Sequence, residues 1–287
     1  MTQGKPDWIR SVYRPQATAE IRALMAQQGL HTVCDEANCP NLGACYGRRT
    51  ATFMLLGNLC TRDCRFCNVV HGVPAPPDPE EPRRLAETAR ALQLRHVVVT
   101  SVTRDDLTDG GASQFAATVR ALRAADPDIT VELLVPDFGG QIRDLDTVLA
   151  ARPDVLNHNL ETVRALYSAV RPGADYARSL ALLTHAKRHC PGVRTKSGLM
   201  VGLGETEQQM AEAMDDLRAA GCDILTVGQY LRPSERHLAV QAYVSPAQFE
   251  DYRRMAEDKG FAYVVSGPLV RSSYRAEEAL RGQEALS

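Results

Sequence analysis

The sequence predicts an α/β protein in which parallel strands alternate with helices and curve into a partial (β/α)6 barrel of the TIM type. Three observations predict it. Short apolar runs recur from about residue 50 onward, helix-length amphipathic segments separate them, and 287 residues suit one barrel-sized domain or two smaller ones. We expect residues 1–49 to be an N-terminal extension, residues 50–245 the barrel, and residues 246–287 a C-terminal segment that closes it.

The apolar runs are rich in leucine and β-branched residues, as expected for strands buried on both faces. The six expected strands are Thr52–Leu56, His96–Thr100, Ile129–Val135, Val155–Asn159, Gly198–Val201 and Ile224–Val227. The helical stretches between them include Pro82–Leu94, Ala112–Ala125, Tyr176–His189 and Thr206–Ala220, and a helix near Pro246–Lys259 precedes a last strand-like run, Ala262–Val265. Because such scaffolds carry their functional groups at the C-terminal ends of strands, we expect the site there.

Composition excludes some classes of function. The chain is 44% hydrophobic and 24% charged, with a net charge of −2, so no nucleic-acid footprint is expected. The opening MTQGKPDWIR does not resemble a signal peptide, and no apolar run approaches the roughly 18 residues of a membrane span. Five prolines in Val73–Pro82 predict an extended connector. We expect a soluble, cytoplasmic monomer.

The cysteines are unevenly placed. Six of the eight fall between Cys34 and Cys67, whereas Cys190 and Cys222 lie at helix–loop boundaries and are expected to be free thiols. Without a secretory signal, clustered cysteines indicate metal ligands or redox groups more than a disulfide framework.

One triplet, Cys60, Cys64 and Cys67, has the spacing C-x3-C-x2-C and follows the first expected strand. Three thiolates in one loop can hold one face of a 4Fe–4S cluster and leave the fourth iron open, since such clusters normally take four cysteines. A structural zinc site is the alternative, although zinc sites usually pair C-x2-C units and close four protein ligands.

The other triplet, Cys34, Cys39 and Cys45, has the spacing C-x4-C-x5-C in a loop rich in turn-forming residues. It indicates a second metal cage, with incidental thiols as the alternative. Two triplets of different spacing predict two separate clusters.

The segment GNLCTRDCRFCNV, with Phe66 before its last cysteine, resembles the signature of the radical S-adenosylmethionine (SAM) superfamily. Six further segments are similar, in the same order, to the lipoyl synthase family within it: CDEANCPNLGAC, TSVTRDDLTDGGA, NHNLETV, KSGLMVGLGE, GQYLRPS and VRSSYRA. The resemblance implies a barrel of the radical SAM kind. It also implies that the open iron binds the amino and carboxylate groups of SAM, whose cleavage gives a 5′-deoxyadenosyl radical that abstracts a hydrogen atom.

Family membership would make the chain an enzyme that inserts two sulfur atoms into the octanoyl chain of octanoyl-lysyl carrier domains, giving the lipoyl (dihydrolipoyl) group and using two SAM molecules. The triplet Cys34, Cys39 and Cys45 would hold an auxiliary 4Fe–4S cluster that is consumed as the sulfur donor. A serine of the RSSY segment would be its fourth ligand, Ser272 or Ser273, of which the family pattern favours Ser273. Serine oxygen binds these soft clusters less well than thiolate, and a labile corner suits a cluster that gives up sulfur.

The resemblance also implies partners. They are octanoylated carrier domains of 2-oxoacid dehydrogenase E2 subunits and the glycine cleavage H protein, an electron donor such as ferredoxin or flavodoxin, and an iron–sulfur carrier protein.

Polar and glycine-rich strand ends supply candidate SAM contacts. Gly198, Gly202 and Glu205 resemble an element of the superfamily that approaches the adenine of SAM. Asp109, Gly110 and Gly111 resemble one that contacts the amino group of SAM, although the acids of the segment Thr103–Gly111 could instead cap the helix near Ala112. Asn157, Asn159 and Glu161 could bind ribose hydroxyls or substrate, or form a polar layer inside the barrel. His158 needs no role as a general base, and Lys196 could pair with a strand-end acid.

Two other classes of function remain. An iron–sulfur scaffold protein would need no SAM pocket, which the GLMVGLGE segment argues against. Another radical SAM sulfur transferase, biotin-synthase-like or methylthio-transferring, is the second, but a tRNA-modifying version should carry a basic appendage that this chain lacks.

Overall fold

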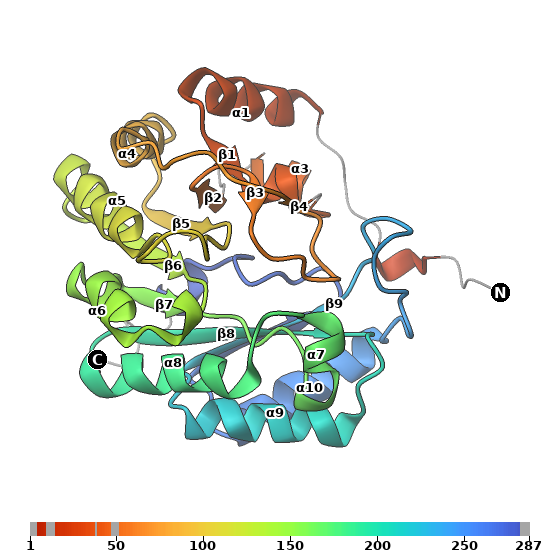
Figure 1. Cartoon of the computed structure of the whole chain (residues 1–287). Coiled ribbons are helices and arrows are strands. Elements are labelled where there is room, and N and C mark those ends of the chain that lie inside the picture. The colour runs from red at the N-terminus through yellow and green to blue at the C-terminus, as the bar shows by residue number, and fades with distance from the viewer. Residues whose placement is uncertain (1–4, 10–14, 38, 47–51, 282–287) are drawn as a thin grey trace.

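The computed structural model describes residues 5–9, 15–37, 39–46 and 52–281 (Figure 1). One curved eight-stranded sheet organises the chain, in the order β1-β2-β5-β6-β7-β8-β9-β10. All neighbouring strands from β2 to β10 are parallel, and β1 pairs antiparallel with β2. The strands of this sheet are β1 (His31–Thr32), β2 (Thr52–Leu55), β5 (His96–Ser101), β6 (Thr130–Leu134), β7 (Val155–Asn157), β8 (Arg194–Val201), β9 (Ile224–Gln229) and β10 (Tyr263–Gly267).

Helices follow the strands and cover the outer side of the sheet, where Figure 1 shows α4, α5, α6, α8 and α9 one after another. A small parallel pair, β3 (Leu59–Cys60) and β4 (Val70–His71), stands apart from the main sheet. The helices are η1 (Asp7–Ile9), α1 (Pro15–Gln28), α2 (Val33–Glu36), α3 (Leu42–Tyr46), α4 (Glu81–Ala91), α5 (Ala112–Ala125), η2 (Phe138–Gly140), α6 (Ile142–Ala150), η3 (Arg164–Leu166), α7 (Tyr167–Val170), α8 (Tyr176–His189), α9 (Glu207–Ala219), α10 (Pro246–Asp258) and α11 (Glu278–Arg281).

The expected partial barrel is confirmed, with β10 as a seventh parallel strand. Helices α5 and α8 have the predicted bounds. Several elements differ from expectation, among them β8 and α6. Strand β8 begins at Arg194, four residues before the expected start, and α6 was not foreseen. The first half of β8 escaped detection because it reads Arg194–Ser197 (RTKS), which is polar although largely buried.

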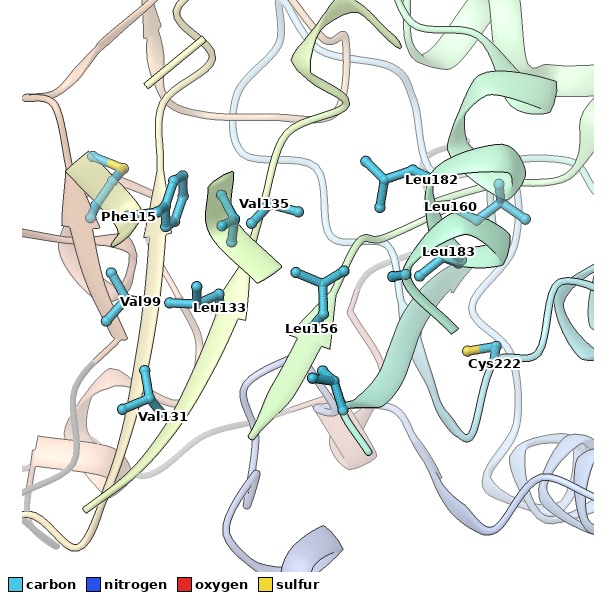
Figure 2. Close-up of a cluster of buried hydrophobic side chains, with 14 of the residues drawn as sticks. Val99, Phe115, Val131, Leu133, Val135, Leu156, Leu160, Leu182, Leu183 and Cys222 are labelled. Atoms are coloured by element: carbon cyan, nitrogen blue, oxygen red, sulfur yellow. The ribbon is translucent and has the colours of Figure 1, made fainter. Parts of the chain in front are cut away.

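The core lies between the sheet and its helices. Figure 2 shows Val99, Leu133 and Leu156, from β5, β6 and β7, among side chains that include Leu182 and Leu183 of α8. These aliphatic side chains are nearly or fully buried, as close packing requires. The core fixes the strands whose C-terminal ends build the site.

A buried polar layer lies inside the barrel. The ammonium group of Lys196 pairs with Glu132 at 2.8 Å, which confirms that Lys196 forms a salt bridge. Asn157 also donates to Glu132, at 3.0 Å, and the register places it beside Lys196. A buried ion pair persists only when its remaining hydrogen-bonding capacity is met, and Asn157 contributes to that. Asn157 therefore belongs to this layer.

Of the N-terminal extension expected at residues 1–49, residues 1–4, 10–14, 38 and 47–49 lie outside the described part of the chain. Among the described helices, none is both long enough and apolar enough to cross a bilayer.

Candidate functional site

A cavity of about 670 Å³ opens at the C-terminal ends of the barrel strands. Strand-end residues line it, including Ser101 of β5, Leu134 of β6 and Gln229 of β9. The site therefore lies where βα barrels carry their functional groups. Five of the six clustered cysteines line this one cavity: Cys34, Cys39, Cys60, Cys64 and Cys67.

The triplet Cys60, Cys64 and Cys67 lies in the loop between β2 and α4. Two backbone N–H groups point at the Cys60 sulfur, from Arg62 at 3.4 Å and Thr103 at 3.3 Å. The Cys67 N–H donates to the Cys64 carbonyl at 3.0 Å, which turns the chain so that three thiols face one space. N–H groups directed at sulfur favour a negatively charged ligand sphere and are one means by which proteins set cluster potentials.

An ion-pair network anchors this loop to the barrel. The Arg62 guanidinium pairs with Asp105 at 2.7 Å and with the buried carboxylate of Asp137 at 2.8 Å. Burial acts to raise the pKa of Asp137, but the hydrogen bond and charge of Arg62 prevail and hold it at about 2. Asp137 is thus ionised at any working pH, and it ties the cysteine loop to the segment that follows β6.

The segment that follows β9 also contacts this cysteine loop. His237 donates from Nε2 to the Cys67 carbonyl oxygen at 2.9 Å, and Ser234 lies 2.8 Å from its Nδ1. The Leu238 N–H donates to the Arg65 carbonyl oxygen at 3.2 Å. The segment after β9 therefore lies on the cysteine loop. The carbonyl can only accept, so Nε2 carries a proton in this arrangement.

The triplet Cys34, Cys39 and Cys45 lies around α2 and α3. The Cys39 N–H donates to the Cys34 carbonyl at 3.1 Å, and the Cys45 N–H to the Asn41 carbonyl at 2.9 Å. Thr32 caps α2 by accepting from the Asp35 N–H. The three cysteines line a second, smaller pocket, and Cys34 and Cys39 line the large cavity as well.

The C-terminal segment folds back onto this triplet. Asn41 donates from its side chain to the Leu269 carbonyl at 2.6 Å, across 228 positions of sequence. The Val270 carbonyl lies so close to Gly228 that a Cβ there would come within 2.2 Å of it, so only glycine fits. Ser273 lines the small pocket together with the three cysteines, whereas Ser272 lines only the large cavity.

The donors suit iron–sulfur clusters. Burial raises the pKa of Cys34 and of Cys67 to about 12, with the neighbouring cysteines adding to the effect. Grouped buried thiols with high pKa values are costly to ionise alone and gain by exchanging protons for iron. In the residues that the structure describes, no three His, Cys, Asp or Glu side chains converge on a point suited to one metal ion. Each triplet instead lines a pocket.

Polar side chains from β7 onward complete the cavity wall. Asn159 donates to Glu161 at 3.0 Å, and no described residue pairs with its buried Oδ1. Glu161 has φ of +69° and is held by hydrogen bonds to β8 on both sides, from its N–H to Gly198 and from Met200 to its carbonyl. Burial raises the pKa of Glu161, while nearby Arg171 opposes that effect. Asn159, Glu161 and Arg171 can therefore present an amide, a carboxylate and a cation to a zwitterionic ligand.

The glycine-rich end of β8 divides between two roles. Gly198 lines the cavity, and a Cβ there would lie 2.9 Å from both Asn159 and Thr226. Gly202 and Glu205 lie outside the cavity lining. The Glu205 carboxylate accepts from the N–H groups of Gly202 and Leu203, at 2.5 and 2.9 Å, so it shapes the turn.

Asp109, Gly110 and Gly111 do not line the cavity either. Asp109 accepts from the N–H groups of Gly111 and Ser113, both at 2.9 Å, at the start of α5. The capping role that the sequence also allowed is therefore present. A contact of these three residues with SAM stays a prediction. Phe66 does line the cavity, beside the last cysteine of its triplet.

Sequence reasoning missed three residues of this site: Arg171, Arg271 and His237. Arg171 donates to the Asn159 carbonyl at 2.9 Å and to the Tyr167 hydroxyl at 2.7 Å. Arg271 lines both pockets, and the charges of Cys39 and Glu161 act on it. No spacing rule marks these positions, although Arg271 and His237 stand in or beside the segments VRSSYRA and GQYLRPS.

Comparison with known proteins agrees with this geometry. The family model described as the radical SAM superfamily matches residues 54–217. A lipoyl synthase of Caldanaerobacter subterraneus subsp. tengcongensis is 56% identical over 98% of this chain and 98% of that protein. One from Symbiobacterium thermophilum is 59% identical over 96% of this chain and 86% of that protein.

Solved structures show the same fold at low identity. Methylornithine synthase (PylB) superposes with a TM-score of 0.50 at 14% identity, covering 81% of this chain and 80% of that one. Coproporphyrinogen III oxidase (HemN) from Escherichia coli, a radical SAM enzyme, gives a TM-score of 0.53 at 18% identity over 71% and 51% of the two chains.

Proposed function

Because the chain belongs to the radical SAM superfamily and, within it, to the lipoyl synthase family, we propose that it inserts two sulfur atoms into the octanoyl chain of octanoyl-lysyl carrier domains. The product is the lipoyl (dihydrolipoyl) group. The observation that carries the proposal is that cysteines of both triplets, five of the six in all, line one cavity of about 670 Å³. A sulfur donor and a radical source must both reach the same acyl chain, and a shared cavity permits that.

In this proposal each cysteine triplet holds its own iron–sulfur cluster. Cys60, Cys64 and Cys67 hold the cluster that binds SAM, and Cys34, Cys39 and Cys45 hold the auxiliary cluster with Ser273 as fourth ligand. When bound, the first cluster supplies the electron that cleaves SAM to methionine and a hydrogen-abstracting 5′-deoxyadenosyl radical, and the second supplies the sulfur atoms. Ser273 is favoured over Ser272 because it shares the small pocket with all three cysteines.

The protein's own residues orient the reactants. Glu161 and Arg171 offer opposite charges on one wall, which suits the amino and carboxylate groups of SAM. Gly198 leaves room for the side chains of Asn159 and Thr226, since a Cβ there would lie 2.9 Å from both, and Asn159 offers an amide oxygen to a ribose hydroxyl. Apolar side chains such as Leu134 and Leu199 line the same cavity and suit an octanoyl chain. Such fixed groups hold reacting atoms close together.

Two segments from the C-terminal part of the chain exclude water from the cavity. The segment after β9 lies on the cysteine loop through His237 and Leu238, and the strap 268–274 crosses from β10 to the N-terminal triplet. A substrate radical is protected when water is excluded. In this proposal residues 1–49 supply auxiliary ligands and residues 50–245 most of the SAM barrel, while residues 246–287 add α10 and the last barrel strand, β10, before the strap with its serine.

The acceptor is a carrier domain, as expected for the family. We propose E2 subunits of 2-oxoacid dehydrogenases and the glycine cleavage H protein as acceptors. Ferredoxin or flavodoxin would supply electrons, and an iron–sulfur carrier protein would rebuild the auxiliary cluster. The alternatives of another radical SAM sulfur transferase or a non-catalytic scaffold are not favoured, because the lipoyl synthase relatives match at 56% and 59% identity over nearly the whole chain.

The test is anaerobic reconstitution followed by incubation with SAM, a reductant and an octanoylated carrier domain. We expect the intact carrier to gain two sulfur atoms by mass spectrometry, with two molecules of 5′-deoxyadenosine formed per lipoyl group. SAM cleavage without sulfur in the carrier would contradict the proposal.

A further inference from the structure

Arg171 places a cation in the wall of the cavity, directly after α7. Its Nη1 donates to the Asn159 carbonyl at 2.9 Å and to the Tyr167 hydroxyl at 2.7 Å, and these two bonds occupy both hydrogens of that nitrogen. The buried Nε has no hydrogen-bond partner among the described residues. Since arginine binds a carboxylate through two parallel N–H groups, the unpartnered Nε indicates the side on which an anion would be met.

The Tyr167 hydroxyl begins a chain of hydrogen bonds through the protein interior. Its oxygen lies 2.7 Å from Ser179 Oγ, which lies 2.9 Å from His158 Nε2. The other ring nitrogen of His158, Nδ1, lies 2.9 Å from the Val135 carbonyl oxygen. The side chains of this chain are 4%, 0% and 1% exposed at Tyr167, Ser179 and His158, so bulk water cannot replace a missing partner.

The hydrogens in this chain run in one direction. Burial, with the nearby cation Arg171, lowers the pKa of His158 to about 4, so the ring is neutral and carries one proton. The Val135 carbonyl can only accept, so that proton is on Nδ1, and Nε2 must accept from Ser179. The Asp175 carbonyl, 3.1 Å from Ser179 Oγ, already accepts the Ser179 N–H. Ser179 therefore directs its one hydroxyl hydrogen at the ring.

Tyr167 must consequently donate to Ser179, because the only hydroxyl hydrogen of Ser179 points to His158. The Tyr167 oxygen is then an acceptor toward Arg171. The guanidinium carbon of Arg171 also lies 5.3 Å from the centre of the Tyr167 ring. A neutral acceptor orients the guanidinium without neutralising it, so the positive charge stays available to a ligand.

We infer that Tyr167 is a positioning residue, which holds Arg171 with its Nε side toward the carboxylate of the bound ligand. The chain through Ser179 to His158 fixes the direction of the Tyr167 hydroxyl. The inference rests on the proposed function, in which Glu161 and Arg171 bind the amino and carboxylate groups of SAM. Tyr167 and Ser179 do not line the cavity, so they act on the ligand through Arg171.

Binding of two ligands tests the positioning role. Tyr167→Phe keeps the ring against Arg171 and removes only the hydroxyl. The reconstituted variant, kept without reductant so that SAM is not cleaved, should bind SAM about fivefold or more weakly, because a hydrogen bond to a charged group is lost. Its Kd for decarboxylated SAM, which lacks only the carboxylate, should match wild type in the same anaerobic equilibrium dialysis. Ser179→Ala should show a smaller loss with the same selectivity.

A double-mutant cycle with Arg171→Gln shows whether Tyr167 acts through that cation. Arg171→Gln should weaken the binding of SAM and not of decarboxylated SAM. Adding Tyr167→Phe should weaken it little further, because the two changes remove one interaction. Tyr176→Phe is the matched control: its ring packs edge-on against Tyr167 with centroids 5.2 Å apart, but its hydroxyl donates to Asp216, outside the chain. Its Kd for SAM should equal that of wild type.

Equal losses for both ligands in Tyr167→Phe would overturn the inference, because the hydroxyl would then support the fold alone. Unchanged SAM binding in Tyr167→Phe, additive losses in the double variant, or an equal loss in Tyr176→Phe would overturn it too. A loss in Arg171→Gln that is equal for both ligands would overturn it together with the carboxylate assignment. Failure of the proposed function looks different: the selective losses are then seen, but the wild-type enzyme adds no sulfur to the carrier.

Discussion

The two cysteine triplets differ in how the chain builds them. Cys60, Cys64 and Cys67 lie within eight residues of one loop, which Arg62 ties to Asp137 and which His237 covers. The other triplet spreads over twelve residues of the N-terminal extension and meets Ser273 from the far end of the chain. The loop of Cys60, Cys64 and Cys67 is short and ion-paired to the barrel, so we expect it to be rigid. The pocket of Cys34, Cys39 and Cys45 is closed by two segments that are distant in sequence, so we expect that it can open. A catalyst that is reused suits the first, and a cluster that is consumed suits the second.

Removing each triplet should give the largest and most contrasting effects. Cys60, Cys64 and Cys67 changed together to alanine should remove about half of the roughly eight irons of two cubanes and all SAM cleavage. The same change at the other triplet should remove the other half and leave SAM cleavage without sulfur insertion. Iron and sulfide assays with 5′-deoxyadenosine quantitation check this. Full iron content in the upstream triple variant would refute two separate clusters.

Replacing Ser273, the proposed fourth ligand, tests the auxiliary pocket by itself. Ser273→Cys exchanges a weak oxygen ligand for a strong thiolate, so the auxiliary cluster should be retained while sulfur insertion falls by most of its rate. Ser273→Ala is less decisive because water can take the site. Ser272→Cys is the matched control, since Ser272 does not line the small pocket. Normal turnover of Ser273→Cys would contradict the assignment, and a defect confined to Ser272→Cys would move the ligand to that neighbour.

A buried hydrogen-bond network connects two residues of the cavity wall, Arg171 and His158. Arg171 donates to Tyr167, Tyr167 lies 2.7 Å from Ser179, and Ser179 lies 2.9 Å from His158, whose Nδ1 donates to the Val135 carbonyl. Burial lowers the pKa of His158 to about 4, from its ordinary value of 6.5, and the nearby cation Arg171 adds to this. Below pH 6.5 the unfolded chain therefore binds a proton that the folded chain refuses.

The free energy of unfolding should consequently fall as pH drops from about 6.5 to 4, by up to roughly 3 kcal/mol from this group. Urea unfolding of the cluster-free protein at several pH values measures it. His158→Gln cannot titrate, so it should be less stable than wild type near pH 7.5 and lose less stability toward pH 5. Identical pH dependence in the two proteins would show that the network does not control this change.

The closure of the auxiliary pocket depends on one long-range hydrogen bond, from Asn41 to the Leu269 carbonyl. Asn41→Ala removes the bond to the Leu269 carbonyl and should cost about 1 kcal/mol, which is roughly a fivefold change in the population of the opened strap. Loss of the auxiliary cluster in air should speed up by a similar factor while the SAM-binding cluster, an internal control in the same molecule, keeps its rate. Deleting the chain from Leu269 onward should do more. Equal acceleration at both clusters would contradict a local effect.

The predictable features of this chain are those that depend on local pattern. Six strands were identified from short apolar runs, and helix α5 from amphipathic spacing. These elements can be predicted because the hydrophobic pattern of neighbouring residues determines them. The polar start of β8 was missed because Lys196 is buried through a partner, Glu132, that lies 64 positions away. For the same reason no spacing indicated Arg171 beside Glu161. Pairing across the fold decides such positions.

The two proposed clusters should have different fates in one cavity. A single turnover of the fully loaded enzyme with excess SAM and octanoylated carrier, without any repair protein, tests it when iron and sulfide are counted before and after. We expect about eight irons at the start, and about four at the end, with SAM cleavage still supported on fresh reductant. Retention of all the iron and sulfide after one lipoyl group per chain, or equal loss from both triplets, would contradict the claim.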